Sequence, residues 1–154
     1  MREKVIIKKV NTTDLDKFKN EIKELIKQVW LVSFPNFKLE QDFLEERLSK
    51  IRQYLENDEG IIVGAFENNT IIGYIWFFKT DSKRLHINEF VVSNRFRGEG
   101  IGTMLMAEVY KVAEKFGINQ IELKVSDSNK NAIEFYQHKD FEIERYLLVK
   151  KIND

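Results

Sequence analysis

The sequence predicts an α/β fold with one mixed, mostly antiparallel and twisted sheet of about six strands, flanked by about four helices. Three apolar runs of strand length follow one another between residues 61 and 92 with short polar turns between them, which is typical of an antiparallel meander. Elsewhere, apolar residues recur at spacings of three and four, which is typical of helices that cover a sheet. No internal repeat or low-complexity segment interrupts residues 1–154, so we expect a single domain.

The N-terminal part is expected to contain a short strand and two helices. Residues 5–10 carry an apolar strand pattern, and residues 15–29 have one apolar face and one face rich in lysine and glutamate. Residues 30–37 are interpreted as an aromatic-rich loop, because Pro35 disfavours a helical conformation at the residue before it. The helical pattern returns over residues 39–55.

The middle and the end of the chain are expected to build most of the sheet. The meander strands are predicted at residues 61–66, 71–78 and 85–92, and a long helix at residues 104–116, which Gly117 closes as a C-cap. The alternation then predicts a half-buried strand, a short helix and a final strand. Their ranges are residues 118–125, 130–138 and 141–152.

Composition and charge exclude several classes of function. The chain has 25 basic and 25 acidic residues, so it lacks the net positive charge that favours sequence-independent nucleic-acid binding. It has no cysteine, and its two histidines, His86 and His138, lack the spacing of a zinc site, so we expect no metal. The longest apolar runs are too short to span a bilayer and the N-terminus lacks a run of signal-peptide length, so no membrane association and a cytoplasmic location are expected.

A glycine-rich turn follows the strand that ends at Val92. Three glycines lie within residues 98–102, between that strand and the next predicted helix, and such a turn presents backbone N–H groups to an anion. A Walker loop would need a lysine before Thr103, and a dinucleotide fingerprint would need glycine at that position. Neither common nucleotide motif therefore explains the turn, and a turn without a ligand is the alternative.

Two motifs resemble signatures of the GCN5-related N-acetyltransferase (GNAT) superfamily. The first is Arg95-x-x-Gly98-x-Gly100, which is similar to the family's Gln/Arg-x-x-Gly-x-Gly/Ala loop. The second is Asn129-x-x-Ala132-Ile133-x-Phe135-Tyr136-x-x-x-Asp140-Phe141. Asp140 stands where the family usually has glycine, but aspartate tolerates a left-handed backbone better than most residues. The order of the predicted elements is also that of the GNAT fold, so the resemblance covers nearly the whole chain.

The resemblance implies acetyl-CoA as co-substrate and a set of residues that hold it. The glycine turn would bind the pyrophosphate, with Arg95 and Arg97 as charge partners. The backbone edge of the strand at residues 90–92 would bind the pantetheine and polarise the thioester carbonyl, with Val92 as the expected donor, and Asn129 would bind the pantetheine arm. The implied cofactor-binding residues are Phe90, Val91, Val92, Arg95, Arg97, Gly98, Glu99, Gly100, Ile101, Gly102, Thr103, Asn129 and Tyr136.

Two residues are candidates for proton transfer. Tyr136 matches the family's general acid, which protonates the departing thiolate of CoA; the alternative is a packed aromatic side chain. Glu89, just before the first motif, is the candidate general base; the alternative is a strand residue that faces solvent. Because the chain has no cysteine and no serine-nucleophile motif, we expect direct transfer to an amine in a ternary complex.

The acceptor side is less defined by sequence. Residues 30–39 either line an apolar pocket or cap the core, and the segment after Phe141 is short, which leaves one side of the acceptor site open or completed by a second subunit in a homodimer. The acceptor amine belongs to a small molecule or a protein. Two other functions remain open: a non-catalytic acyl-CoA-binding sensor or interaction module, and a different nucleotide-binding enzyme.

Overall fold

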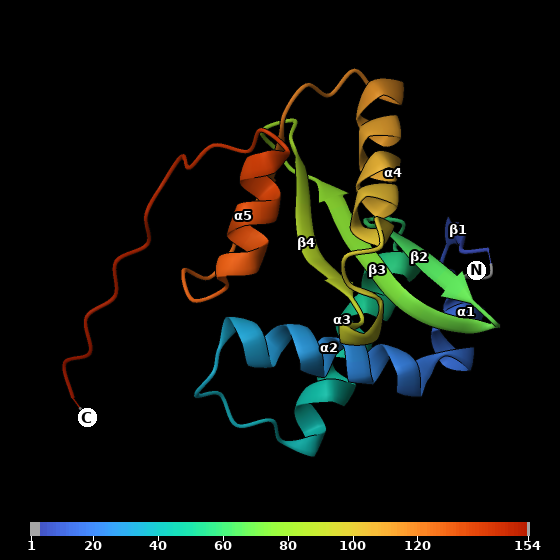
Figure 1. Cartoon of the computed structure of the whole chain (residues 1–154), viewed down its shortest axis with the longest axis horizontal. Helices are drawn as coiled ribbons and strands as arrows, with labels where there is room; N and C mark the ends of the chain where they lie inside the picture. The colour runs from blue at the N-terminus through green and yellow to red at the C-terminus, as the bar shows by residue number, and fades with distance from the viewer. Residues whose placement is uncertain (1–3, 154) are drawn as a thin grey trace.

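The computed structural model describes residues 4–153, apart from the side chain of Gln41, and contains one five-stranded sheet (Figure 1). Its strands lie in chain order, and the first four are antiparallel to their neighbours, whereas β5 runs parallel to β4. The mixed, mostly antiparallel sheet that the sequence predicts is therefore confirmed. The strands are β1 (Ile6–Lys9), β2 (Ile61–Glu67), β3 (Thr70–Lys79), β4 (Leu85–Val92) and β5 (Ile121–Leu123).

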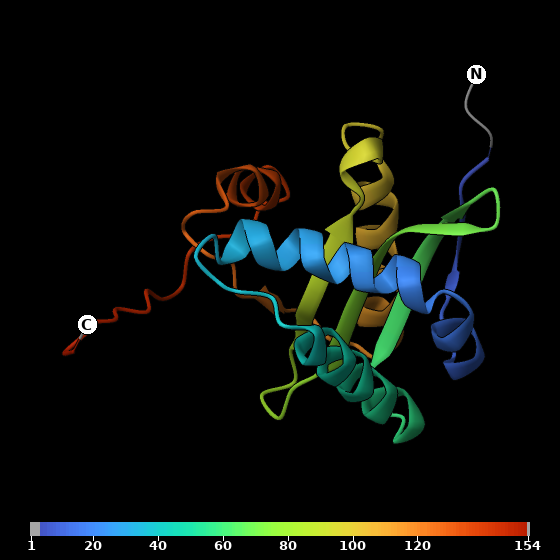
Figure 2. The same ribbon diagram turned by 90° about the horizontal axis from the view of Figure 1, so that it is seen from below.

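Helices cover both faces of the sheet (Figures 1 and 2). The α-helices are α1 (Thr12–Lys17), α2 (Lys19–Ser33), α3 (Gln41–Glu56), α4 (Ile101–Lys115) and α5 (Lys130–His138), and a 3-10 turn, η1, spans Asn94–Phe96. Side chains of α1, α2 and α3 form one core with one face of the sheet, and α4 forms a second core with the other face. Within the described part of the chain, no helix is both long and apolar enough to span a bilayer.

A β-bulge in β4 reverses which face its side chains point to. Trp76 pairs with Glu89 but Phe77 pairs with Ile87, so Asn88 is an extra residue on β4. Side chains alternate along a strand, and one inserted residue shifts that alternation. Ile87 accordingly belongs to the core beneath α4, whereas Val91 belongs to the core beneath α2 and α3. Glu89 therefore points toward α2 and α3.

The last two strands separate soon after they pair. The three residues of β5 pair with Leu85, His86 and Ile87 only. Within residues 4–153, the backbone of β4 from Asn88 to Val92 has no strand partner on the β5 side. The meander thus ends in a strand with one free backbone edge.

Three predicted boundaries were wrong. The predicted loop at residues 30–37 is helical as far as Ser33, because the Trp30 ring packs against Phe34, Phe37 and Phe43 and helical backbone brings these rings together. The predicted strand at residues 118–125 is limited to β5. The predicted final strand at residues 141–152 is an extended segment that leaves the body of the protein. It has no strand partner among residues 4–153, so the sheet of the described residues has five strands instead of about six.

The predicted end of α4 is confirmed. Gly117 follows the C-cap with φ of +65°, its N–H donates to the carbonyl of Glu114 at 3.2 Å, and the N–H of Ile118 donates to the carbonyl of Ala113 at 2.8 Å. This pair of hydrogen bonds is a Schellman motif, which requires a left-handed residue that glycine adopts without strain.

Candidate active site

The glycine turn joins β4 to α4 in the conformation that its sequence predicts. Gly98 and Gly100 have φ of +79° and +81°, and a Cβ at either position would meet no atom within 4 Å. Glycine is therefore needed at these two positions for backbone conformation and not for space. Gly100 is the N-cap of α4, and as a glycine it has no side chain to cap the first turn of that helix. The N-terminus of a helix carries backbone amides without intrahelical partners and a positive potential, which suit an anion.

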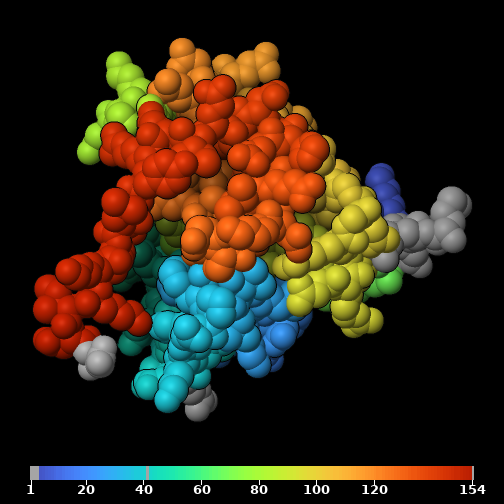
Figure 3. All heavy atoms as spheres, turned by 60° about the vertical axis from the view of Figure 1, so that its left-hand side comes forward, coloured from blue at the N-terminus to red at the C-terminus, as the bar shows by residue number. Residues whose placement is uncertain are grey.

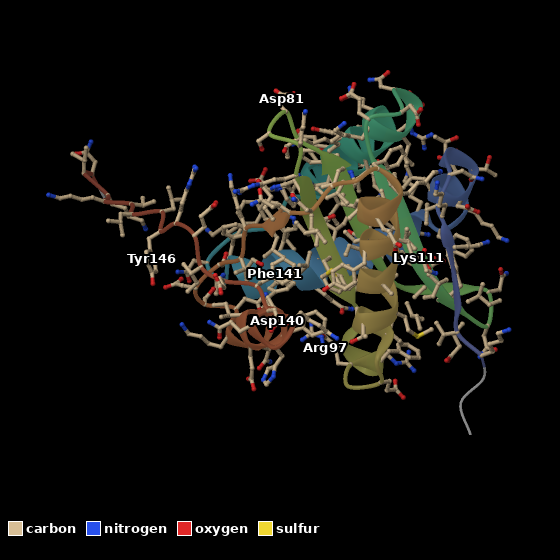
Figure 4. All side chains as sticks on the ribbon, turned by 90° about the horizontal axis from the view of Figure 1, so that it is seen from above. Asp81, Arg97, Lys111, Asp140, Phe141 and Tyr146 are labelled. Atoms are coloured by element: carbon tan, nitrogen blue, oxygen red, sulfur yellow. The ribbon has the colours of Figure 1, made fainter. Side chains whose placement is uncertain are left out.

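Hydrogen bonds fix the turn to the rest of the fold. The N–H of Asn94 donates to Oε1 of Gln28 on α2 at 3.0 Å, and Nε of Arg97 donates to the carbonyl of Val92 at 3.4 Å. Arg95 and Arg97 are exposed, and Arg97 lies beside the start of α4 in Figure 4. The turn therefore combines a fixed backbone with cationic side chains that reach solvent.

The free edge of β4 carries the backbone groups of alternate residues. The N–H of Ser93 donates to the carbonyl of Ile72 on β3 at 2.8 Å. Successive backbone N–H groups of a strand point to opposite edges, so the N–H groups of Val92 and Phe90 point to the free edge. The backbone N–H of Val92, the predicted donor, thus points to the side of β4 from which β5 has separated.

Aromatic side chains join β4, α4 and α5. Gly102, in the first turn of α4, lies beside both rings: a Cβ there would be 3.4 Å from the Phe90 ring and 3.5 Å from the Phe135 ring, in ordinary van der Waals contact. The rings of Phe90 and Phe135 are in edge contact with centroids 5.8 Å apart. In the space-filling view, α5 lies against both the glycine turn and the end of α2 (Figure 3).

Tyr136 lies half-buried in this aromatic group. Its ring centroid is 6.3 Å from that of Phe90 and 5.6 Å from that of Phe141. Burial raises the pKa of the Tyr136 phenol well above its usual value of about 10. Among the described residues, no group hydrogen-bonds to its hydroxyl, which therefore stays protonated at neutral pH and is available as a donor.

Asp140 supplies the left-handed residue that the second motif requires. Its φ is +67°, its N–H donates to the carbonyl of Gln137 at 3.1 Å, and the N–H of Phe141 donates to the carbonyl of Tyr136 at 3.0 Å. These bonds form a Schellman motif at the end of α5, in which the side chains of Tyr136 and Phe141 pack together. Aspartate therefore replaces glycine here without loss of the turn.

Asn129 begins the helix that carries Tyr136. Its Oδ1 accepts a hydrogen bond from the N–H of Ala132 at 3.3 Å, so it is the N-cap of α5. The cap uses only the side-chain oxygen and leaves the amide nitrogen of Asn129 outside that bond.

Glu89 is buried and hydrogen-bonded, so it does not face solvent as the alternative interpretation required. Only 4% of its side chain is exposed. Its Oε1 accepts a 2.6 Å hydrogen bond from the hydroxyl of Tyr74, and its Oε2 accepts from Nη2 of Arg47 at 3.0 Å and Nε1 of Trp30 at 3.2 Å. Each donor comes from a different element: Tyr74 from β3, Arg47 from α3 and Trp30 from α2. The structure thus places a carboxylate within the protein next to the free edge of β4.

A protein-family model matches the part of the chain that carries both motifs. The model of the acetyltransferase (GNAT) family matches residues 22–141, which is most of the chain and includes the glycine turn, Glu89 and Tyr136. The chain belongs to the GNAT family. The family resemblance stated from the two sequence motifs is thereby confirmed.

Individual GNAT proteins are similar over part of the chain. An uncharacterised N-acetyltransferase of Methanocaldococcus jannaschii is 36% identical over 94 residues, which is 57% of this chain and 42% of that protein. The thialysine N-ε-acetyltransferase of Mus musculus is 30% identical over 78 residues, which is 48% of this chain and 46% of that enzyme. The matched part thus spans less than half the length of either relative.

A solved GNAT structure has the same fold. The PaiA N-acetyltransferase of Thermoplasma acidophilum, solved in complex with coenzyme A, superposes with a TM-score of 0.74 at 22% identity and covers 92% of each chain. The predicted fold class is therefore confirmed.

In this GNAT fold, Arg47 is the ion-pair partner of the candidate base Glu89, and it was not singled out from the sequence. Its guanidinium lies over the rings of Trp30 and Trp76, with its central carbon 5.4 and 5.8 Å from their centroids, and only 15% of its side chain is exposed. A signal existed, because Arg47 lies on the apolar face of α3, four residues after Phe43 and four before Ile51. A cation on the buried face of a helix indicates a buried anion, which here is Glu89.

In this GNAT fold, aromatic side chains at and after the end of α2 form one cluster with Phe43 of α3. The Trp30 ring lies 4.8 Å from Phe34, 5.5 Å from Phe37 and 4.8 Å from Phe43, measured between centroids. Phe34 and Phe37 are 46% and 37% exposed, so the cluster covers the core beneath it and also reaches the surface. The cluster therefore caps the core, which is one of the two uses predicted for residues 30–39, and an apolar acceptor pocket there stays a prediction.

The two candidate proton-transfer side chains lie on opposite sides of β4. Glu89 points toward α2 and α3, whereas the next residue, Phe90, contacts Tyr136 on α5. The free backbone edge of β4 lies between them. A thioester held along this edge would therefore have a carboxylate on one side and a phenol on the other.

Proposed function

We propose that the chain is an acetyl-CoA-dependent N-acetyltransferase that moves the acetyl group directly to a primary amine of a small molecule or a protein in a ternary complex. One observation carries this proposal: the free edge of β4 ends in the glycine turn and is flanked by Glu89 and Tyr136. The glycine turn suits the pyrophosphate, the free edge of β4 suits the thioester, and Glu89 suits the acceptor amine.

The donor would bind along β4. The N–H groups at the start of α4 and the side chains of Arg95 and Arg97 suit the pyrophosphate, since both supply positive potential. The pantetheine would pair with the free edge of β4, with Asn129 as a further hydrogen-bonding partner. The N–H of Val92 would then donate to the thioester oxygen, whose negative charge grows during attack.

The acceptor amine would enter on the side of Glu89. A carboxylate accepts about four hydrogen bonds, and Tyr74, Arg47 and Trp30 use three of these positions. The remaining position, on Oε1, accepts a proton from the amine directly or through a water molecule. The aromatic rings near Glu89 also suit an ammonium group, because aromatic faces attract cations.

Transfer would follow without a covalent enzyme intermediate. The amine nitrogen forms a bond to the acetyl carbon, the carbon–sulfur bond breaks, and the hydroxyl of Tyr136 gives its proton to the thiolate of CoA. Because Glu89 belongs to β4 and Tyr136 packs against the opposite face of that strand, the two proton transfers would occur on either side of one reacting carbon.

The similarity to a thialysine N-ε-acetyltransferase supports a primary amine on an alkyl chain as the first acceptor to test. Calorimetric titration with acetyl-CoA and CoA measures donor binding, and initial rates at several concentrations of both substrates measure the order of the reaction. Intersecting double-reciprocal lines are expected for a ternary complex, and parallel lines would contradict it. Binding without turnover of any amine would favour an acyl-CoA sensor.

A further inference from the structure

One side chain of α2 binds the segment that joins β4 to the glycine turn. Oε1 of Gln28 accepts a 3.0 Å hydrogen bond from the backbone N–H of Asn94, the first residue of η1. The two residues are 66 positions apart in the sequence, so this contact depends on the fold and not on the local motif. It connects the helix that carries Trp30 with the turn that is proposed to bind the donor.

The bond lies between the two parts of the proposed donor site. Asn94 follows Val92, whose N–H is the proposed donor to the thioester, and precedes the glycine turn, which is proposed to bind the pyrophosphate. The N–H of Ser93 donates to the carbonyl of Ile72 at 2.8 Å, so β3 fixes the end of β4. Gln28 then holds the next residue, at which the chain leaves the sheet for the turn.

The helix that carries Gln28 is itself well anchored. Three apolar side chains in the middle of α2 are at most 3% exposed and belong to the core beneath it. They are Ile22, Leu25 and Ile26. At the end of the helix, the carbonyls of Val32 and Ser33 lie 3.5 and 3.4 Å from Oγ of Ser128, in the loop before α5. A hydrogen bond from such a helix can restrict the position of a surface turn.

A second side chain of α2 binds the other end of the same strand segment. Nε1 of Trp30, two residues after Gln28, donates to Oε2 of Glu89 at 3.2 Å. Glu89 and Asn94 bracket residues 90–92, along which the thioester would lie. One short stretch of α2 thus bonds to both ends of this segment, on the acceptor side through Trp30 and on the donor side through Gln28.

We propose that Gln28 is a positioning residue for CoA, which holds the glycine turn in the conformation that binds the pyrophosphate. The inference rests on the proposed binding of CoA at this turn. Apparent affinity falls with the fraction of molecules in the binding-competent conformation, so a bond that raises this fraction raises the affinity. Asn94 is exposed, so water replaces the lost acceptor when Gln28 is changed, and the stability of the fold changes little.

The test is the dissociation constant of CoA, measured by calorimetric titration of the full chain. Gln28→Leu removes the acceptor oxygen at similar side-chain volume and should weaken CoA binding about two- to tenfold, the range expected for one hydrogen bond. Gln120→Leu is the matched control. Oε1 of Gln120 also accepts a hydrogen bond, from Nε of Arg84 at 2.8 Å, but it lies beside the start of β4, at the opposite end from the turn. This variant should bind CoA as the wild type does.

Amide hydrogen exchange separates positioning from a general structural role. In the free protein, Gln28→Leu should exchange the amides of residues 94–98 severalfold faster than the wild type, with nearly the same melting temperature. Saturating CoA should remove this difference.

Unchanged CoA affinity or unchanged exchange in Gln28→Leu would overturn the proposal, and so would an equal loss of affinity in Gln120→Leu. A wild-type protein that binds no CoA would overturn the proposed function together with the inference. Binding of CoA by the wild type with equal affinity in Gln28→Leu would overturn the inference alone. None of these measurements needs an acceptor amine.

Discussion

The hydroxyl of Tyr74 donates a 2.6 Å hydrogen bond to Oε1 of Glu89 in the interior of the protein. The two residues lie on neighbouring strands, where Tyr74 pairs with Val91 and Glu89 pairs with Trp76. They share a face because paired residues of neighbouring strands, and alternate residues along one strand, point to the same side of the sheet. The bulge at Asn88 then gives Ile87, on the other side of the inserted residue, the opposite face.

Replacing Glu89→Gln should reduce kcat by about 10²- to 10⁴-fold, because a neutral amide cannot take a proton from the amine. The affinity for CoA, measured by calorimetry, should change little, because Glu89 lies on the face of β4 away from Tyr136. Glu122→Gln is the matched control, since Glu122 is ion-paired with His86 and Arg84 on the neighbouring strand. An unchanged kcat and pH profile in Glu89→Gln would remove Glu89 from the mechanism.

Replacing Tyr136→Phe should also reduce kcat by about 10²- to 10⁴-fold, since the departing thiolate would lose its proton donor. The stability of the protein at neutral pH should change little, because no protein group among the described residues hydrogen-bonds to this hydroxyl. Thiol release at saturating acetyl-CoA measures the effect. Full kcat in this variant would show that Tyr136 serves only as a packed aromatic side chain.

Stability at high pH should depend on Tyr136. Burial raises the pKa of its phenol in the folded protein, so the folded state keeps a proton that the unfolded chain releases above about pH 10. The unfolded state then binds fewer protons, and stability falls as the pH rises above that value. Between about pH 8 and 11, the thermal unfolding temperature should fall less in Tyr136→Phe than in the wild type. An equal fall in both proteins would contradict the raised pKa.

Replacing Arg47→Met should destabilise the fold by about 3 kcal/mol, because Glu89 would remain buried without its cation. The double variant Arg47→Met with Glu89→Gln should recover much of this loss, since both charges are then absent. Denaturant unfolding of the two single variants and the double variant measures the coupling. If the two single losses of unfolding free energy simply added in the double variant, the ion pair would not stabilise Glu89 in the fold.

Replacing Gly100→Val should weaken CoA binding by at least about tenfold, because a β-branched residue resists the positive φ of this position. Gly117→Val is the matched control: Gly117 also has a positive φ but lies at the opposite end of α4. Both variants should lose about 1 to 2 kcal/mol of stability. Only Gly100→Val should lose affinity, and equal losses of affinity would contradict a role of the turn in binding.

Features set by local sequence could be predicted. The glycine turn, α5 and the left-handed residues Gly117 and Asp140 each depend on neighbours a few positions away, and the structure confirms their conformations. The acid candidate Tyr136 and the cap Asn129 were found for the same reason, since both belong to one short motif. Their proposed roles in acetyl transfer remain predictions.

Features set by distant contacts could not be predicted. Nothing near Asn88 signals the bulge, which is visible only in the pairing of β4 with β3. The partnership of Glu89 with Arg47 joins residues 42 positions apart. The strand pattern of residues 141–152 gave the correct extended backbone but not its partner, because pairing depends on a surface elsewhere.

The most direct test of the proposed activity follows both products of one reaction. Purified protein is incubated with acetyl-CoA and a panel of primary amines, and free thiol and acetylated amine are quantified together, with Glu89→Gln and Tyr136→Phe measured in parallel. Acetyl transfer predicts equal amounts of both products for at least one amine, little thiol release without amine, and strongly reduced rates in both variants. Binding of acetyl-CoA with no acetylated product from any amine or protein substrate would contradict the proposed function.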